Sequence, residues 1–133
     1  MMDMKLKEII NEQYVPVGAS WTNNNVEIRK MYEGRISFKF SKIMNCIVLV
    51  EPPSNKCSDN AVIFNLDGKI KFRLKNPLSE ENSRASFVWV EDTNSSEIEL
   101  FVSSFDPILK RRKERKYTLN EYSFELENET QVR

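Results

Sequence analysis

Two groups of charged residues are the parts of this sequence whose residue types could do chemistry. Residues 79–106 carry seven acidic residues and one arginine, and residues 110–116 carry six cations and one glutamate. Paired carboxylates can act as a general acid and a general base, and a run of cations can bind phosphate groups. Which of these applies depends on the residues that accompany them.

The residues that usually accompany catalytic carboxylates are missing. The chain has no histidine, which is the commonest general base near neutral pH. Its three glycines do not form a glycine-rich loop of the kind that binds nucleotide phosphates. We therefore expect a protein that is not an enzyme, with no catalytic residue, no cofactor and no small-molecule substrate.

Metal binding is not expected either. The two cysteines, Cys46 and Cys57, are too few and too far apart for a four-ligand zinc site. The segment Asn65-Leu66-Asp67-Gly68 offers oxygen ligands, but it lacks the spacing and the closing glutamate of an EF-hand loop. Turn chemistry explains that segment.

The amino terminus and the apolar runs bear on the compartment. The first eight residues, Met-Met-Asp-Met-Lys-Leu-Lys-Glu, have no long apolar core and no small-residue cleavage site, so no secretory signal is recognised. The longest apolar run, at residues 46–50, is far too short to cross a bilayer. We expect a cytoplasmic protein with free thiols and without a membrane partner.

The cations could form a nucleic-acid site, together with the aromatic residues Phe72 and Tyr117. The zero net charge and a pI near 6.4 argue against this, because nucleic-acid binders usually carry a clear excess of positive charge. Acidic strands next to the basic ones could also neutralise them. The residues of this alternative site are Lys69, Lys71, Arg73, Lys110, Arg111, Arg112 and Lys113.

A hairpin at residues 60–74 is the clearest structural signal. Asp67-Gly68 supplies the positive φ angles of a tight turn, and the apolar residues Ile70, Phe72 and Leu74 alternate with cations after it. Residues 45–50 show no alternation, which indicates a central strand covered on both faces.

Other segments predict two further hairpins, a helix and a strand. Residues 26–32 and 35–40 flank Glu33-Gly34 as a second hairpin, and residues 86–92 and 97–103 flank 93–96 as a third. Residues 3–13 fit a short amphipathic helix, and 117–127 a strand. Residues 110–116 fit a turn or a frayed helical segment.

These elements predict one domain over residues 1–133, with 128–133 as a disordered tail. The predicted fold class is α+β to mostly β. It is an antiparallel sheet of about six to eight strands, rolled into a half-barrel or stacked as a sandwich, with one short N-terminal helix.

A small β-rich domain with no catalytic residues, separate charge strips and an Asn-, Lys-, Ile- and Ser-rich composition resembles the immunity proteins of bacterial polymorphic-toxin and contact-dependent growth-inhibition systems. This resemblance implies a tight one-to-one complex with a cognate protein toxin. Such a toxin is often a nuclease, whose basic groove is blocked by an acidic surface.

In this chain the acidic surface would come from the carboxylates of 91–99 and of 121–125. Trp89 and Phe101 would be aromatic anchors if they are exposed, and ordinary core residues if they are not. The predicted partner-binding residues are Trp89, Glu91, Asp92, Glu97, Glu99, Phe101, Glu121 and Glu125.

Overall fold

All the regular structure in the described part of the chain is β-strand. The computed structural model describes residues 4–53, 57–78, 85–93, 97–106 and 108–132. These residues form eleven strands in three antiparallel sheets, and no helix. The sheet-rich, antiparallel prediction is confirmed, whereas the N-terminal helix and the count of six to eight strands are wrong.

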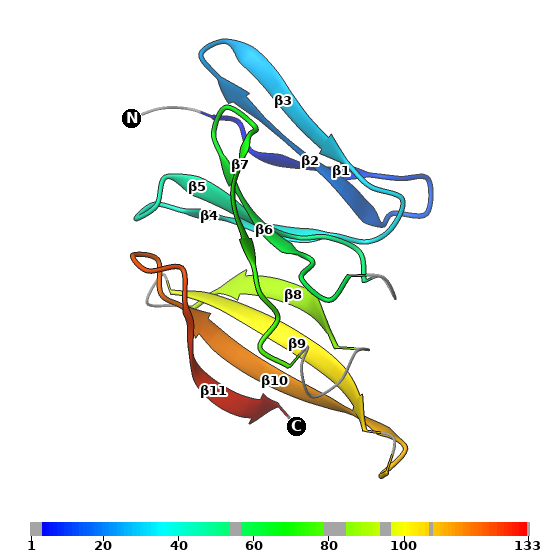
Figure 1. Ribbon diagram of the computed structural model, residues 1–133. Coiled ribbons are helices and arrows are strands. Elements are labelled where there is room, and N and C mark those ends of the chain that lie inside the picture. Colours follow the sequence, from blue (N-terminus) through cyan, green and yellow to red (C-terminus); the bar gives the residue numbers. More distant parts are fainter. Residues whose placement is uncertain (1–3, 54–56, 79–84, 94–96, 107, 133) are drawn as a thin grey trace.

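The three sheets are stacked as layers, with the second sheet between the other two (Figure 1). The first sheet has the order β1-β2-β3, the middle sheet β4-β5-β6-β7 and the third sheet β11-β10-β9-β8. The strands are β1 (Lys7–Ile10), β2 (Pro16–Asn23), β3 (Val26–Met31), β4 (Ser37–Ser41), β5 (Cys46–Val50), β6 (Ala61–Asn65), β7 (Ile70–Leu74), β8 (Ser86–Asp92), β9 (Ile98–Asp106), β10 (Arg111–Leu119) and β11 (Leu126–Val132).

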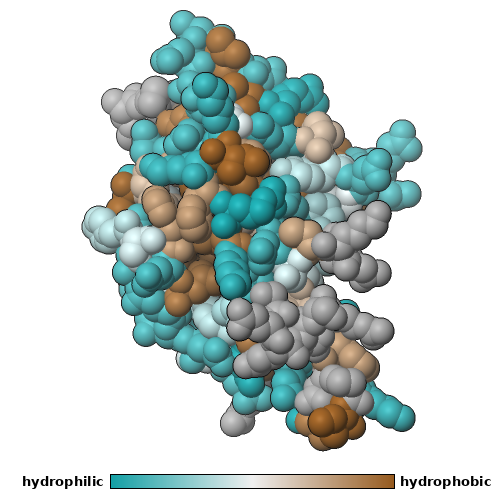
Figure 2. All heavy atoms as spheres, viewed as in Figure 1, coloured by the Kyte–Doolittle hydropathy of each residue, from teal (hydrophilic) through white to brown (hydrophobic). Residues whose placement is uncertain are grey.

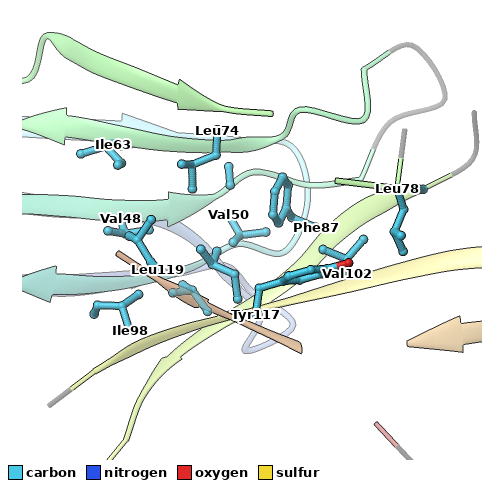
Figure 3. Close-up of a cluster of buried hydrophobic side chains, with 14 of the residues drawn as sticks. Val48, Val50, Ile63, Leu74, Leu78, Phe87, Ile98, Val102, Tyr117 and Leu119 are labelled. Carbon is cyan, nitrogen blue, oxygen red and sulfur yellow. The ribbon is translucent and has the colours of Figure 1, made fainter. Parts of the chain in front are cut away.

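The middle sheet buries both of its faces. All five residues of β5 are buried, which confirms a central strand covered on both sides. Leu49 points into a cluster with Trp21 of the first sheet, and Val48 points into a cluster with Leu100 of the third sheet. Figure 3 shows this second cluster, in which Val48, Val50 and Ile63 face side chains of the third sheet. A strand without alternation is stable here because apolar side chains meet it on each face.

The segment predicted as a helix supplies β1 instead. Lys7 lies opposite Ser20 of β2, and Ile9 lies opposite Gly18. Gly18 allows this close approach, since a Cβ there would lie 2.6 Å from Met31 Sδ and 3.2 Å from Ile9 Cβ. The apolar residues of so short a segment fit either period, and pairing with β2 satisfies the backbone.

The hairpin at residues 60–74 is present as β6 and β7. Gly68 has a φ of 91°, and the Lys69 amide donates to Asp67 Oδ1 over 2.9 Å, as a tight turn requires. However, β7 ends the strand order of the middle sheet, and only Leu74 of its apolar residues is buried. Phe72 is 42% exposed.

The other two predicted hairpins have different outcomes. The third is confirmed as β8 and β9, with Val90 opposite Leu100. The second is wrong, because β3 and β4 belong to different sheets. Strand β3 pairs with β2 instead. The two strands are joined by Asn24 and Asn25, whose φ angles of 50° and 66° suit a two-residue hairpin turn.

The C-terminal segments also differ from expectation. The basic run lies in β10, the expected strand at 117–127 is divided by a turn, and residues 128–132 continue β11 rather than forming a disordered tail. Strand β10 is paired on both sides, and its Tyr117 and Leu119 enter the core. Backbone pairing and these two inward residues hold a strand whose other side chains are mostly charged.

One buried amide joins the middle sheet to the third. Asn60 is 3% exposed, and its side-chain nitrogen donates to the carbonyl oxygens of Glu51 (2.9 Å) and Phe87 (2.7 Å). Its side-chain oxygen accepts from the Phe87 amide over 2.8 Å. Asn60 therefore satisfies both backbone groups of Phe87 in β8, where the two layers meet.

We predict that Leu49→Ala lowers the free energy of unfolding by about 2–5 kcal/mol, because it leaves a cavity between the first and middle sheets. Denaturant unfolding measures the change. The matched control is Ile70→Ala on the exposed side of β7, which should cost less than about 1 kcal/mol. Equal losses in the two variants would contradict the layered core.

We predict that Asn60→Asp lowers the free energy of unfolding by at least about 2 kcal/mol at neutral pH, because a carboxylate cannot donate to the Glu51 and Phe87 carbonyls. Asn24→Asp makes the same change in an exposed turn and should stay within about 0.5 kcal/mol of the parent. Similar unfolding midpoints for both variants would show that the Asn60 bridge contributes little.

Candidate partner-binding surface

Four of the predicted residues share the outer face of the third sheet, which points away from the middle sheet. The alternation of β8 and β9 sends Val90 and Leu100 inward, so their neighbours point outward. The register places Trp89 opposite Phe101 and Glu91 opposite Glu99. Trp89 is 39% exposed and Phe101 is half-buried, so both aromatic residues lie outside the core cluster. We call Trp89, Glu91, Glu99 and Phe101 the outer-face group.

The charges of the outer-face group are partly compensated within the sheet. Lys116 of β10 lies opposite Phe101, and its Nζ is 3.3 Å from Glu99 Oε2. The Glu99 side chain is only 14% exposed. Two carboxylates directly opposite each other repel, so Lys116 stabilises the pairing of Glu91 with Glu99. Glu99 thus has a structural role, and Glu91 is the more available carboxylate.

Three other predicted residues line a hollow at one end of the stacked sheets. The hollow is about 500 Å³ in volume and is formed where the β4–β5, β8–β9 and β10–β11 connections meet. Its lining includes the carboxylates Asp92, Glu97 and Glu121, together with the apolar Phe40, Ile43 and Ile98 and the cation Lys42. We call this site the end hollow.

Neighbouring residues orient two of the carboxylates in the end hollow. Asp92 Oδ1 lies 3.6 Å from Lys39 Nζ on β4, and the Ser41 hydroxyl donates a short hydrogen bond to Glu121. Glu97 is exposed, and its backbone amide donates to Thr93 Oγ1 over 3.2 Å. In the end hollow, Asp92 and Glu121 are therefore bound by neighbouring side chains, whereas Glu97 is exposed.

Glu125 lies elsewhere. It lines a second hollow of about 480 Å³, with Leu74 of β7 and Leu126 of β11 among the other lining residues. Beside it the rings of Phe72 and Phe124 stack with centroids 5.5 Å apart, so this contact joins the edge of the middle sheet to the turn before β11. Glu125 is thus separated from the seven other predicted residues.

Glu91 and Asp92 are consecutive in β8, so their side chains point to opposite faces of the third sheet, Glu91 outward and Asp92 toward Lys39 of the middle sheet and the end hollow. The exposed Ile43 in the β4–β5 turn was missed in the sequence reading. Its signal is an isolated aliphatic residue in a polar turn, where no core requires it. The candidate surface therefore has two parts that share strand β8, the outer-face group and the end hollow.

The alternative basic residues do not form one strip, because β7 and β10 belong to different sheets. Arg73 is bound to Glu51 over 2.5 Å and to the Asp59 carbonyl over 3.0 Å, and the Glu51 hydrogen bond raises the pKa of Arg73. Arg112 donates to Ser103 Oγ over 3.1 Å.

Strand β10 also pairs with acids on its two neighbours. Arg115 Nε lies 3.2 Å from Glu129 of β11, and Lys116 contacts Glu99 of β9. The Tyr117 hydroxyl donates to the same Glu129 carboxylate over 2.9 Å. Cross-strand pairing of opposite charges therefore accounts for much of the basic run.

Other chemistry has little support in the described residues. They contain no group of three or more thiol or carboxylate side chains placed to hold a metal ion. Both cysteines are free, and burial raises the pKa of the Cys46 thiol, which disfavours a reactive thiolate. Within the same residues, no helix is long and apolar enough to cross a membrane.

The candidate surface is thus defined by shape, exposed aromatic area and charge. Comparisons of the chain with protein-family models, with curated proteins and with solved structures find no match.

Proposed function

We propose that this chain is a non-catalytic protein-binding module, and that its concrete role is that of an immunity protein. In this role it binds a cognate toxin one-to-one in the cytoplasm and covers the toxin's active site. The observation that supports the proposal is that β8 carries both the exposed Trp89, opposite Phe101, and Asp92 of the acid-lined end hollow.

The aromatic pair fits the centre of such an interface. Trp89 is 39% exposed, and Phe101 lies opposite it in the register of β8 and β9. A large, ordered aromatic side chain loses little conformational entropy on binding and buries much apolar area. Ile43 extends the apolar part of the surface beyond the sheet.

The carboxylates fit the rim. Glu91 lies on the outer face one residue before Asp92, and Glu97 lines the end hollow with Asp92. Negative charge at a rim attracts a basic partner and speeds its encounter. A nuclease with a basic substrate groove is the partner chemistry that suits this surface best, and that groove is the part of a nuclease that must be blocked.

The primary experiment takes the protein encoded by the neighbouring gene as the candidate toxin. Co-expression should restore growth to cells that produce this candidate toxin, and the purified proteins should elute as a one-to-one complex. Neither chain should be cleaved or covalently modified in the complex. Continued growth arrest together with separate elution would overturn the proposed role.

We predict that Glu91→Lys with Glu97→Lys slows association with the toxin by at least about tenfold at low salt, because rim charges act mainly on the encounter rate. Stopped-flow or surface-based kinetics measure this rate. The thermal unfolding midpoint should stay close to that of the parent, since Glu99 and its Lys116 pair are left intact.

The matched control is Glu8→Lys with Glu27→Lys, which makes the same change in net charge on exposed positions of the first sheet. Its association rate should change much less. An equal slowing in both double variants would assign the effect to net charge and remove the end hollow from the interface.

We predict that Trp89→Ala weakens the complex by about 2 kcal/mol or more, roughly a thirtyfold rise in Kd, mainly through faster dissociation. Tyr14→Ala is the control, because Tyr14 is 87% exposed in the connection between β1 and β2. Titration calorimetry distinguishes the two. An unchanged Kd for Trp89→Ala would place the interface away from the outer face.

A further inference from the structure

Contrary to the expectation from the sequence that there is no membrane partner, we propose that the tip of the β9–β10 hairpin, residues 108–111, binds the surface of an anionic phospholipid membrane. The site is independent of the proposed toxin surface. Ile98, which lines the end hollow, and Asp106 are the two ends of β9, so the strand separates the sites by about 27 Å. Figure 1 shows that this hairpin projects beyond the edge of the other layers.

The outermost part of the hairpin is apolar. Ile108 is 88% exposed and Leu109 is 53% exposed. Figure 2 shows hydrophobic atoms gathered at this end of the molecule. Single exposed aliphatic residues are common on protein surfaces. Two adjacent exposed aliphatic residues at the tip of a projecting hairpin form a small apolar surface that can insert into the apolar part of a membrane.

Cations follow directly behind the apolar tip. Lys110 closes the turn with a φ of 52°, and Lys110, Arg111 and Arg112 are all exposed. One acid, Asp106, precedes the tip in sequence. Apolar residues in front of a cationic collar match the boundary of an anionic bilayer, where acyl chains lie below phosphate and carboxylate groups. This charge complementarity identifies the occupant.

Nucleic acid is the other polyanion that could bind here, and the tip fits it less well. Base stacking uses aromatic rings, whereas the tip presents two aliphatic side chains. The cations farther along β10 are held by other groups, since Arg115 contacts Glu129 and Lys116 contacts Glu99. The exposed cations of β10 are therefore Arg111 and Arg112, next to the tip, and they do not follow an extended phosphate backbone.

The contact is expected to be reversible. One hairpin inserts only two side chains, and stable membrane anchoring generally requires an apolar and an electrostatic contribution together. Each contribution can be removed separately at this tip. The full chain is mixed with vesicles of phosphatidylcholine, with or without phosphatidylserine, and the bound fraction is measured by co-sedimentation over a salt series.

We predict binding to the phosphatidylserine vesicles that weakens as salt rises, and much weaker binding to phosphatidylcholine alone. Ile108→Ser with Leu109→Ser should lower the partition coefficient by about tenfold or more. Lys110→Gln with Arg111→Gln should lower it by a comparable factor, with loss of the salt dependence. Ile43→Ser with Ile70→Ser is the control, because these exposed aliphatic residues lie outside the tip.

A variant that adds a signal on binding shows whether the losses in the other variants come from misfolding. Leu109→Trp should show a blue shift of its added fluorescence on phosphatidylserine vesicles, and Ile43→Trp should not. The proposal is overturned by absence of vesicle binding at low salt, or by equal loss in the tip and control variants. It is also overturned if the chain binds mixed-sequence RNA through Lys110 and Arg111 but leaves vesicles unbound.

Discussion

The structure depends on a middle sheet that is apolar on both faces. Strand β5 has five buried residues, of which Leu49 packs toward the first sheet and Val48 toward the third. Two strands of this sheet, β5 and β6, are buried on both faces, so two further sheets must cover them. The eleven described strands are therefore arranged in three layers, and Asn60 provides a polar connection where the middle sheet meets β8.

This layering decides where a binding surface can be. The third sheet uses its inner face to cover the middle sheet, so its outer face carries the Trp89–Phe101 pair, Glu91 and Glu99. Its two ends are formed by the connections between its strands. One end contributes to the end hollow, and the other is the β9–β10 tip with the exposed Ile108. Both proposed sites follow from the position of one sheet at the outside of a stack.

Several charged side chains pair with each other within the sheets. Strand β10 brings cations between two strands that carry acids, and Lys116–Glu99 and Arg115–Glu129 are pairs across these strands. Exposed pairs of this kind contribute little stability individually, but they oppose shifted registers that would bring like charges together. Charged side chains at the ends of the strands have fewer cross-strand neighbours. Glu97 and Arg111 are such residues, and they remain at the surface where a partner can reach them.

The sequence by itself determined the features that depend on neighbouring residues. The Asp67-Gly68 turn, the β8–β9 hairpin and the doubly buried run at 46–50 could all be recognised, because turn chemistry and hydrophobic period are local properties. Tertiary structure alone decided that residues 7–10 pair as β1, and that β3 turns back through Asn24-Asn25. These segments are short, and their patterns fit more than one partner. The candidate site likewise depended partly on the sequence and partly on the tertiary structure. Its acids could be named from the sequence, but the meeting of Asp92, Glu97 and Glu121 depends on three connections that only the stacking of sheets brings to one end.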